Sequence, residues 1–181
     1  MRGEGFTLIE LLVTLAVAAV LLTVGVPSVV DWVRDGRMTS QVNELVAALH
    51  LARGEAVKRR TRVVVCASAD GASCGGSGVG WEDGWIVFVD TNGDGAKDSG
   101  EALLGQAAAL SGGNSVKAAI GSVSYRSDGT PAPLGAGTVN GVTFTFCDSR
   151  GAGDARAVVL RPTGAVSTGK RDADGNALSC T

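Results

Sequence analysis

The first 26 residues contain an almost unbroken hydrophobic run. Between Phe6 and Val26, Glu10 is the one ionisable side chain. As an α-helix rising about 1.5 Å per residue, this run would extend roughly 31 Å, close to the thickness of the hydrocarbon core of a bilayer. A carboxylate within such a run costs about 2.5–3.5 kcal/mol if it is charged at the bilayer centre. The pattern therefore predicts a transmembrane helix over residues 6–30 in which Glu10 has a functional role.

A second helical pattern follows the hydrophobic run. Apolar residues recur at alternating spacings of four and three, which places them on one helical stripe. The stripe consists of Met38, Val42, Leu45, Leu49, Ala52 and Ala56, whereas Thr39, Gln41, Asn43 and Glu44 lie largely off it. We interpret residues 31–61 as a continuation of the membrane helix, bent or relaxed near Pro27 and Gly36. His50 lies beside the stripe and is expected to be a surface or half-buried residue.

From residue 62 onwards the hydrophobic period changes to two, which is typical of β-strands. Strands are predicted at residues 62–66, 85–89, 122–126, 142–147, 155–161 and 165–169, with turns at 128–129 and 162–164. We detect neither an internal repeat nor a second domain boundary in residues 62–181. The predicted fold class is α+β, with one long N-terminal helix packed on an antiparallel β-sheet domain.

Composition and cysteine content refine this picture. The chain has 181 residues and a formal net charge of −2, so there is no global basic field to hold nucleic acid. Its four cysteines, Cys66, Cys74, Cys147 and Cys180, all follow the hydrophobic run, and an even number suggests disulfides in a domain outside the cytoplasm. Four cysteines allow three pairings. We favour Cys66–Cys74, which brackets a short loop, and Cys147–Cys180, which would fix the C-terminus. A zinc site is disfavoured because there is no C-x-x-C motif and His50 is distant in sequence.

The N-terminal segment Gly5-Phe6-Thr7-Leu8-Ile9-Glu10 resembles the prepilin signature of type IV pilins and type II secretion pseudopilins. The resemblance implies that residues 1–5 are a leader, that a prepilin peptidase cuts between Gly5 and Phe6, and that Phe6 is then N-methylated. Glu10 would become the fifth residue of the mature chain, a position at which the family has glutamate. The competing interpretation is an ordinary membrane anchor with a stray acid.

Further segments narrow the resemblance to the GspH/FimT family of minor pilins and pseudopilins. They are residues 54–60 running into 63–66, the segment 84–90 and the late turn 161–164. This resemblance implies a type IV pilin-like fold and a single-pass protein of the bacterial inner membrane with a periplasmic C-terminal domain. The protein would help to initiate or cap a pilus or pseudopilus, with other pilins or pseudopilins and the inner-membrane assembly platform as partners. The choice between pilus and secretion machinery stays open.

Glu10 is the candidate assembly residue. One helical face combines mostly small or polar residues suited to close helix–helix contact, namely Thr7, Glu10, Thr14, Ala18, Leu21 and Gly25. In the mechanism that the resemblance implies, Glu10 of one subunit neutralises the amine of Phe6 on its neighbour inside the apolar filament core. A buried pair of this kind sets the register between subunits, and breaking it leaves a charge without a partner.

Residues 90–101 match the calcium-loop template D-x-[DN]-x-[DN]-G-x5-E. The expected ligands are oxygen atoms of Asp90, Asn92, Asp94, Ala96 (its carbonyl), Asp98 and Glu101. The context differs from an EF-hand because a strand, not a helix, enters the loop. Acid- and glycine-rich turns are also common in metal-free hairpins. No cofactor is required by this interpretation, and calcium is the one candidate.

The segment Gly169-Lys170-Arg171-Asp172 supports an alternative function. Some FimT-like minor pilins bind DNA during natural transformation through a basic C-terminal motif, G-R-x-R. Lys170 takes the first basic place of this motif, but Asp172 stands at the second, so Lys170 and Arg171 are the candidate DNA-binding residues. Catalysis is not expected, because the chain has one histidine, no nucleophile elbow and no phosphate-binding G-x-x-x-x-G-K-[ST] loop.

Overall fold

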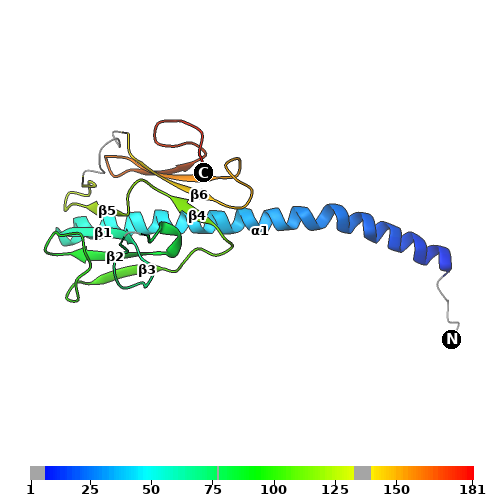
Figure 1. Cartoon of the computed structure of the whole chain (residues 1–181), viewed down its shortest axis with the longest axis horizontal. Coiled ribbons are helices and arrows are strands. Elements are labelled where there is room, and N and C mark those ends of the chain that lie inside the picture. Colours follow the sequence, from blue (N-terminus) through cyan, green and yellow to red (C-terminus); the bar gives the residue numbers. More distant parts are fainter. Residues whose placement is uncertain (1–6, 77, 133–139) are drawn as a thin grey trace. The chain divides into compact units, whose positions relative to one another are not determined.

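The computed structural model describes residues 7–76, 78–132 and 140–181. The chain divides into two units, residues 1–37 and 38–181, which we describe separately. In chain order the elements are α1 (Leu8–Arg59), β1 (Arg62–Ala67), the 3₁₀ turn η1 (Trp81–Asp83), β2 (Trp85–Asp90), β3 (Leu103–Ala107), β4 (Ser115–Lys117), β5 (Ser122–Tyr125), β6 (Val142–Cys147), β7 (Arg156–Leu160) and β8 (Val166–Gly169) (Figure 1).

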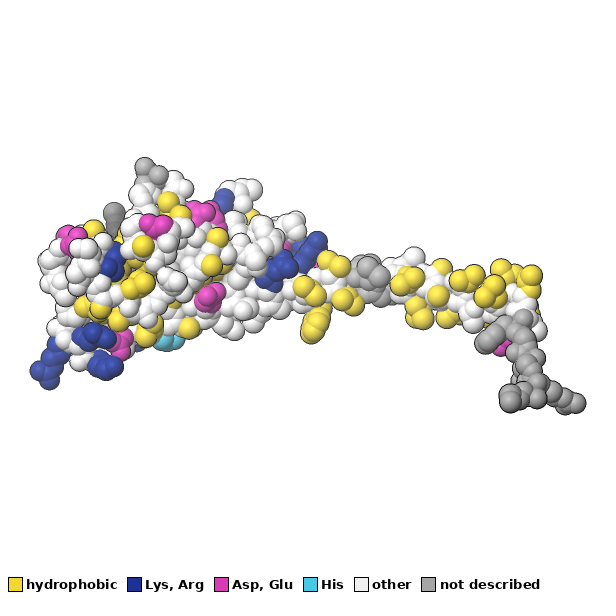
Figure 2. Space-filling model, turned by 90° about the horizontal axis from the view of Figure 1, so that it is seen from below, with side chains coloured by type: hydrophobic (Ala, Val, Ile, Leu, Met, Phe, Trp, Pro, Cys, Tyr) yellow, Lys and Arg dark blue, Asp and Glu magenta, His cyan; other side chains and the backbone are white. Residues whose placement is uncertain are grey.

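The first unit contains the N-terminal part of α1. Its start is capped by Thr7, whose Oγ1 accepts a hydrogen bond of 3.3 Å from the amide of Glu10. Side chains at residues 8–23 and 28–33 are all exposed, and Figure 2 shows groups of hydrophobic side chains along the visible side of this segment. Within the described residues, α1 is the one helix long and apolar enough to cross a membrane. An exposed apolar surface of this kind is typical of a membrane-spanning segment or of a protein–protein interface.

The part of α1 within the second unit presents the predicted apolar stripe to the core. Every member of the stripe from Met38 to Ala56 is buried, and His50 is exposed, as expected. Gln41 differs from the prediction because it is also buried. Its side-chain amide donates to Ser111 O (3.1 Å), and its Oε1 accepts a hydrogen bond from Asn114 Nδ2 (2.6 Å). These bonds satisfy the polar group and tie the loop before β4 to the helix.

α1 is assigned as continuous helix through Pro27 and Gly36 and ends at Arg59. The amide of Thr61 bonds to Ala56 O and that of Arg60 to Val57 O, which is the Schellman arrangement. Arg60 adopts the required left-handed conformation, with φ of 52°. This stop reverses the chain into β1.

The strands of the described residues form two antiparallel four-stranded sheets, with orders β3-β2-β1-β5 and β4-β6-β7-β8. The predicted fold class is confirmed, and the six predicted strands correspond to β1, β2 and β5 to β8. The edge strands β3 and β4, and the division into two sheets, were not predicted. The main core combines the helix stripe with side chains from both sheets, including Trp85, Tyr125 and Phe144.

Candidate functional site

Glu10 lies in the first turn of α1 and is exposed, as are Thr7, Thr14, Ala18 and Leu21 of its helical face. The hydroxyl of Thr14 donates to Leu11 O at 2.9 Å, so it is satisfied within the helix. The predicted cleavage and methylation residues, Gly5 and Phe6, lie outside the described residues. Glu10 thus presents one carboxylate on an otherwise apolar surface, and this group needs a partner once water is removed.

Both predicted disulfides are present. Cys66 is bonded to Cys74 and Cys147 to Cys180, with Cα–Cα distances of 5.5 and 5.9 Å. The second bond fixes the C-terminal segment over a small apolar cluster that includes Ala157, Val159 and Leu178. The prediction of disulfide bonds is confirmed.

The loop closed by Cys66–Cys74 is organised around Asp70, which the sequence analysis did not single out. Its carboxylate accepts hydrogen bonds from the hydroxyl and amide of Ser73, from the amide of Ala72 and from the hydroxyl of Ser68. These donors hold the pKa of Asp70 well below its usual range, and the hydroxyl of Ser73 contributes most to this shift. The signal in the sequence is Ser68-Ala69-Asp70-Gly71, a composition typical of Asx and serine turns.

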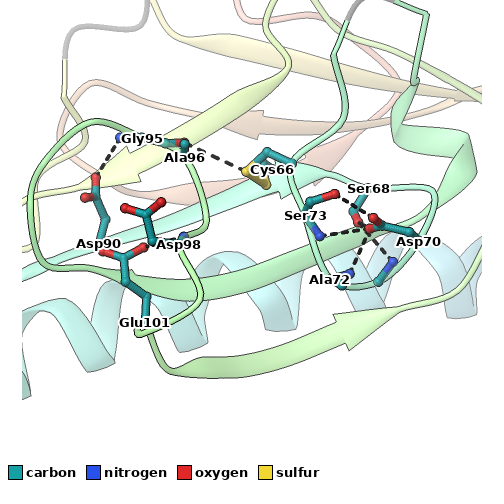
Figure 3. The surroundings of a disulfide bond; sticks show 12 residues. Cys66, Ser68, Asp70, Ala72, Ser73, Asp90, Gly95, Ala96, Asp98 and Glu101 are labelled. Atoms are coloured by element: carbon teal, nitrogen blue, oxygen red, sulfur yellow. Dashed lines mark hydrogen bonds between the residues drawn. A yellow bond between two sulfur atoms is a disulfide. The ribbon is translucent and has the colours of Figure 1, made fainter.

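The acidic loop, residues 90–101, lies next to this disulfide (Figure 3). Cys74 Sγ is 3.8 Å from Gly95 O. The Asp90 carboxylate accepts hydrogen bonds from the amides of Gly93 (2.6 Å) and Gly95 (3.1 Å), and the guanidinium of Arg62 is 3.7 Å away. The template residues therefore do share one loop, and Arg62 is an additional member that the template does not contain.

Glu101 closes the other end of the acidic loop. Its carboxylate accepts hydrogen bonds from the amide and hydroxyl of Thr91 (2.6 and 3.0 Å) and from the amide of Asp98 (3.1 Å). Burial would raise the pKa of Glu101, but the hydrogen bonds from Thr91 and Asp98 outweigh it and lower the pKa below its ordinary value. The carboxylate is thereby held in its charged form.

The acidic loop in this arrangement satisfies its own carboxylates. The side-chain amide of Asn92 donates to both Asp94 and Asp98. Across the part of the chain that the structure describes, no three acidic, histidine or cysteine side chains converge as metal ligands. Calcium would therefore have to displace amide donors from Asp90 and Glu101, and calcium binding stays a prediction.

Lys170 and Arg171 follow β8 and are exposed. They border an open groove of about 480 Å³ that we call the β8 groove, lined by Val159, Arg161, Ser167, Thr168, Gly169, Lys170, Arg171, Asp172 and Gly175. Arg161, a third cation that the motif does not include, donates to Asn140 O (2.9 Å) and Ala173 O (3.0 Å).

Asp172 is a turn residue of the β8 groove. Its carboxylate accepts hydrogen bonds from the amides of Asn176 (2.7 Å) and Asp174 (2.9 Å), and the first of these contributes most to lowering its pKa. The negative charge is thus fixed at the place where the family motif has its second arginine. The residues that line the groove include three cations and one anion, which gives it a modest positive balance.

The comparisons with known proteins agree with this architecture. The type IV minor pilin FimU of Pseudomonas aeruginosa has a TM-score of 0.60 at 19% identity, covering 83% of this chain and 99% of FimU. A second crystal form of FimU has a TM-score of 0.57 at 21% identity, covering 79% of this chain and 99% of FimU. The minor pseudopilin EpsH from the type 2 secretion system of Vibrio cholerae has a TM-score of 0.49 at 14% identity, covering 73% of this chain and 95% of EpsH. At sequence identities of 19% and 21%, the similarity to FimU shows a shared fold and no more.

The family comparison covers most of the sequence. No curated protein matches the chain. A family model for the type II transport protein GspH matches residues 41–164, and one for the prokaryotic N-terminal methylation motif matches residues 1–26. Since the first of these matches spans more than half of the 181 residues, the chain belongs to the GspH family of pilin-like proteins.

Proposed function

We propose that this chain is a minor pilin or pseudopilin, a structural subunit that helps to initiate or cap a type IV pilus or a type II secretion pseudopilus. The observation that carries the proposal is the fully exposed apolar surface of α1 with Glu10 as its one acid between Leu8 and Thr23. Such a surface is stable in a bilayer or among neighbouring helices. No catalytic activity is part of this function.

The proposed function includes a processing and delivery route. A prepilin peptidase removes residues 1–5, Phe6 is methylated, and α1 holds the chain in the bacterial inner membrane with the C-terminal domain in the periplasm. The two disulfides support this location because disulfides persist in oxidising compartments. The inner-membrane assembly platform then transfers the helix from lipid into the filament.

Glu10 has the central role in that transfer. Its carboxylate pairs with the positively charged amine of Phe6 on a neighbouring subunit, in surroundings from which water is excluded. Removing one partner of a buried ion pair costs about 3–5 kcal/mol, because the other charge is left unpaired. We therefore expect Glu10→Ala and Glu10→Gln to prevent incorporation of the chain into filaments.

The test measures the amount of the chain in sheared filament fractions by immunoblot, relative to its amount in membranes. The matched control is Asp31→Ala, which removes an exposed acid of the same helix beyond the hydrophobic run. Normal incorporation of both Glu10 variants would refute the assembly role of this residue. Equal loss in the Asp31 control would show that the effect is not specific to Glu10.

The second candidate function is capture of DNA for uptake at the tip of a pilus. The β8 groove favours it, because Arg161, Lys170 and Arg171 border one open surface. Binding would consist mainly of phosphate contacts and would weaken steeply with salt. The full chain in detergent should then give a salt-sensitive gel shift that Lys170→Glu/Arg171→Glu abolishes.

The control for this gel shift is Lys117→Glu/Arg126→Glu, which reverses two exposed cations elsewhere in the domain. This variant should keep the shift of the parent chain. The frequency of natural transformation should fall in the variant at Lys170 and Arg171 and stay at the parental value in the control variant. An unchanged shift in the variant at Lys170 and Arg171 would reject the β8 groove as the DNA site.

A further inference from the structure

Three apolar side chains continue the surface of α1 beyond its hydrophobic run. Val29, Trp32 and Val33 are 59%, 76% and 46% exposed. Their spacing of three and four places them on one helical face. Leu15 and Leu22 precede Val29 at intervals of seven residues, or about two turns, and are also exposed. We call the set Val29, Trp32 and Val33 the boundary face, and it lies on the same helical face as Leu15 and Leu22.

The length of the helix determines the depth of the boundary face. Trp32 is 24 residues after Leu8, which corresponds to about 36 Å along a helix axis. The hydrocarbon core is about 30 Å thick, and the headgroup regions bring the bilayer to about 40–45 Å. With Leu8 at one border of the core, Trp32 reaches about 6 Å past the other border. A tilt of about 20° shortens the span by roughly 2 Å and keeps Trp32 within the headgroup layer.

The chemistry of the boundary face fits that layer. An indole has an apolar ring and one N–H donor, and tryptophan is enriched where a bilayer meets water. Among the described residues, none accepts a hydrogen bond from the Trp32 indole, in contrast to Trp81, whose Nε1 donates to Ile120 O at 2.7 Å. Charged side chains follow the hydrophobic run at the same depth along the helix as Trp32, beginning with Asp31 and Arg34, which form an ion pair at 3.3 Å.

We propose that the boundary face contacts phospholipid headgroups, with the Trp32 ring in the headgroup layer close to the acyl chains. The contact fixes how deeply the helix sits before the subunit is drawn into a filament. This proposal rests on the membrane anchoring included in the proposed function. The competing occupant of the face is the helix of a second copy of this chain, which the experiment below detects.

The fluorescence of the full chain reports on Trp32. The other two tryptophans, Trp81 and Trp85, are 3% and 1% exposed in the core of the second unit, so lipid-borne quenchers act on Trp32. The chain is reconstituted into phosphatidylcholine/phosphatidylglycerol vesicles that carry a nitroxide either on the headgroup or deep in an acyl chain. Flotation in a density gradient first establishes whether the chain is anchored.

In floating vesicles the headgroup nitroxide should quench more emission than the deep nitroxide, and Trp32→Phe should lose this quenchable emission while it still floats. Stronger quenching by the deep nitroxide, or none by either, overturns the proposal and leaves the anchoring intact. Quenching that emerges only when the protein is diluted in lipid assigns the face to a second copy and also overturns the proposal. A chain that does not float contradicts the anchoring and the boundary contact together.

Discussion

At the scale of single residues, two buried carboxylates organise the acidic loop beside the Cys66–Cys74 disulfide. Asp90 is 1% exposed and Glu101 8% exposed. Burying a carboxylate is costly unless donors surround it, and here backbone amides of the same loop donate to both groups. The loop therefore depends on these hydrogen bonds for its shape.

Stability should consequently depend on pH in the acidic range. The folded-state pKa of Glu101 lies below its ordinary value, so its contribution to stability is complete above the ordinary pKa. That contribution is lost as the pH falls through the lowered pKa of the folded state. We expect the free energy of unfolding to fall as the pH drops below the ordinary pKa of a glutamate, and Glu101→Gln to cost about 1–3 kcal/mol at pH 7.

Urea denaturation at several pH values tests this expectation. Glu101→Gln should flatten the acidic fall in stability, since the titrating group is gone. Glu44→Gln, at an exposed position of α1, serves as the control and should leave the curve unchanged. A variant at position 101 with the stability and pH slope of the parent would contradict the role assigned to its carboxylate.

Local sequence signals predicted residues whose environment depends on near neighbours. The stripe from Met38 to Ala56 follows from helical periodicity, whereas calcium binding by the acidic loop stays a prediction. Gln41 was misplaced because its partners Ser111 and Asn114 are 70 and 73 residues away in sequence. For the same reason the template could not show that Arg62 approaches Asp90.

At the scale of elements, the two strands that the sequence analysis missed lie at sheet edges. β3 reads Leu-Leu-Gly-Gln-Ala and contains no β-branched residue, and β4 has only three residues. An edge strand buries less of its surface, so its alternation is weaker than that of a central strand such as β1 or β2. Periodicity also carries no information on which strands pair, so the division into two sheets could not be predicted.

Two turns meet on α1 at Arg53. The Arg53 guanidinium donates to Gly164 O (3.0 Å) and Thr163 O (3.4 Å) in the turn between β7 and β8. Gly164 has a φ of +79°, and a Cβ added there would lie 2.8 Å from Gly129 O in the turn after β5. Both turns were predicted from their glycines, but their contact with each other and with the helix was not.

Gly164→Ala should therefore destabilise the domain. The substitution places a side chain in a left-handed conformation and against a backbone oxygen, at a cost of about 1–3 kcal/mol. Gly121→Ala is the matched control, because no atom lies within 4 Å of its added Cβ. Thermal or urea unfolding of both variants gives the comparison, and equal stability would show that the turns do not pack as described.

At the scale of the whole molecule, the two disulfides should differ in their contribution to stability. Cys147–Cys180 closes a segment with a sequence separation of 33, and Cys66–Cys74 one of 8. In the chain-entropy account, removing the first costs roughly 3–4 kcal/mol and removing the second roughly 2–3 kcal/mol. Urea denaturation of Cys147→Ser/Cys180→Ser and Cys66→Ser/Cys74→Ser measures the order. A larger loss for the shorter loop would mean that local contacts around Asp70, not chain entropy, dominate.

The proposed function treats the whole chain as a subunit of a filament. Its parts agree: an exposed apolar helix, one acid near the start of that helix, and a disulfide-bonded domain of the GspH family. Each part has another use in some other protein, but the proposed processing at Gly5 and assembly would account for all of them in one chain. The state of the N-terminus inside isolated filaments therefore distinguishes this account from an ordinary membrane anchor.

Mass spectrometry of sheared and purified filaments from the producing cells is the most direct test. If the chain is processed and assembled as proposed, the filaments contain a form that begins at Phe6, carries one methyl group on its amine and lacks residues 1–5. Recovery of the chain only in membranes, with residues 1–5 still attached, would contradict it.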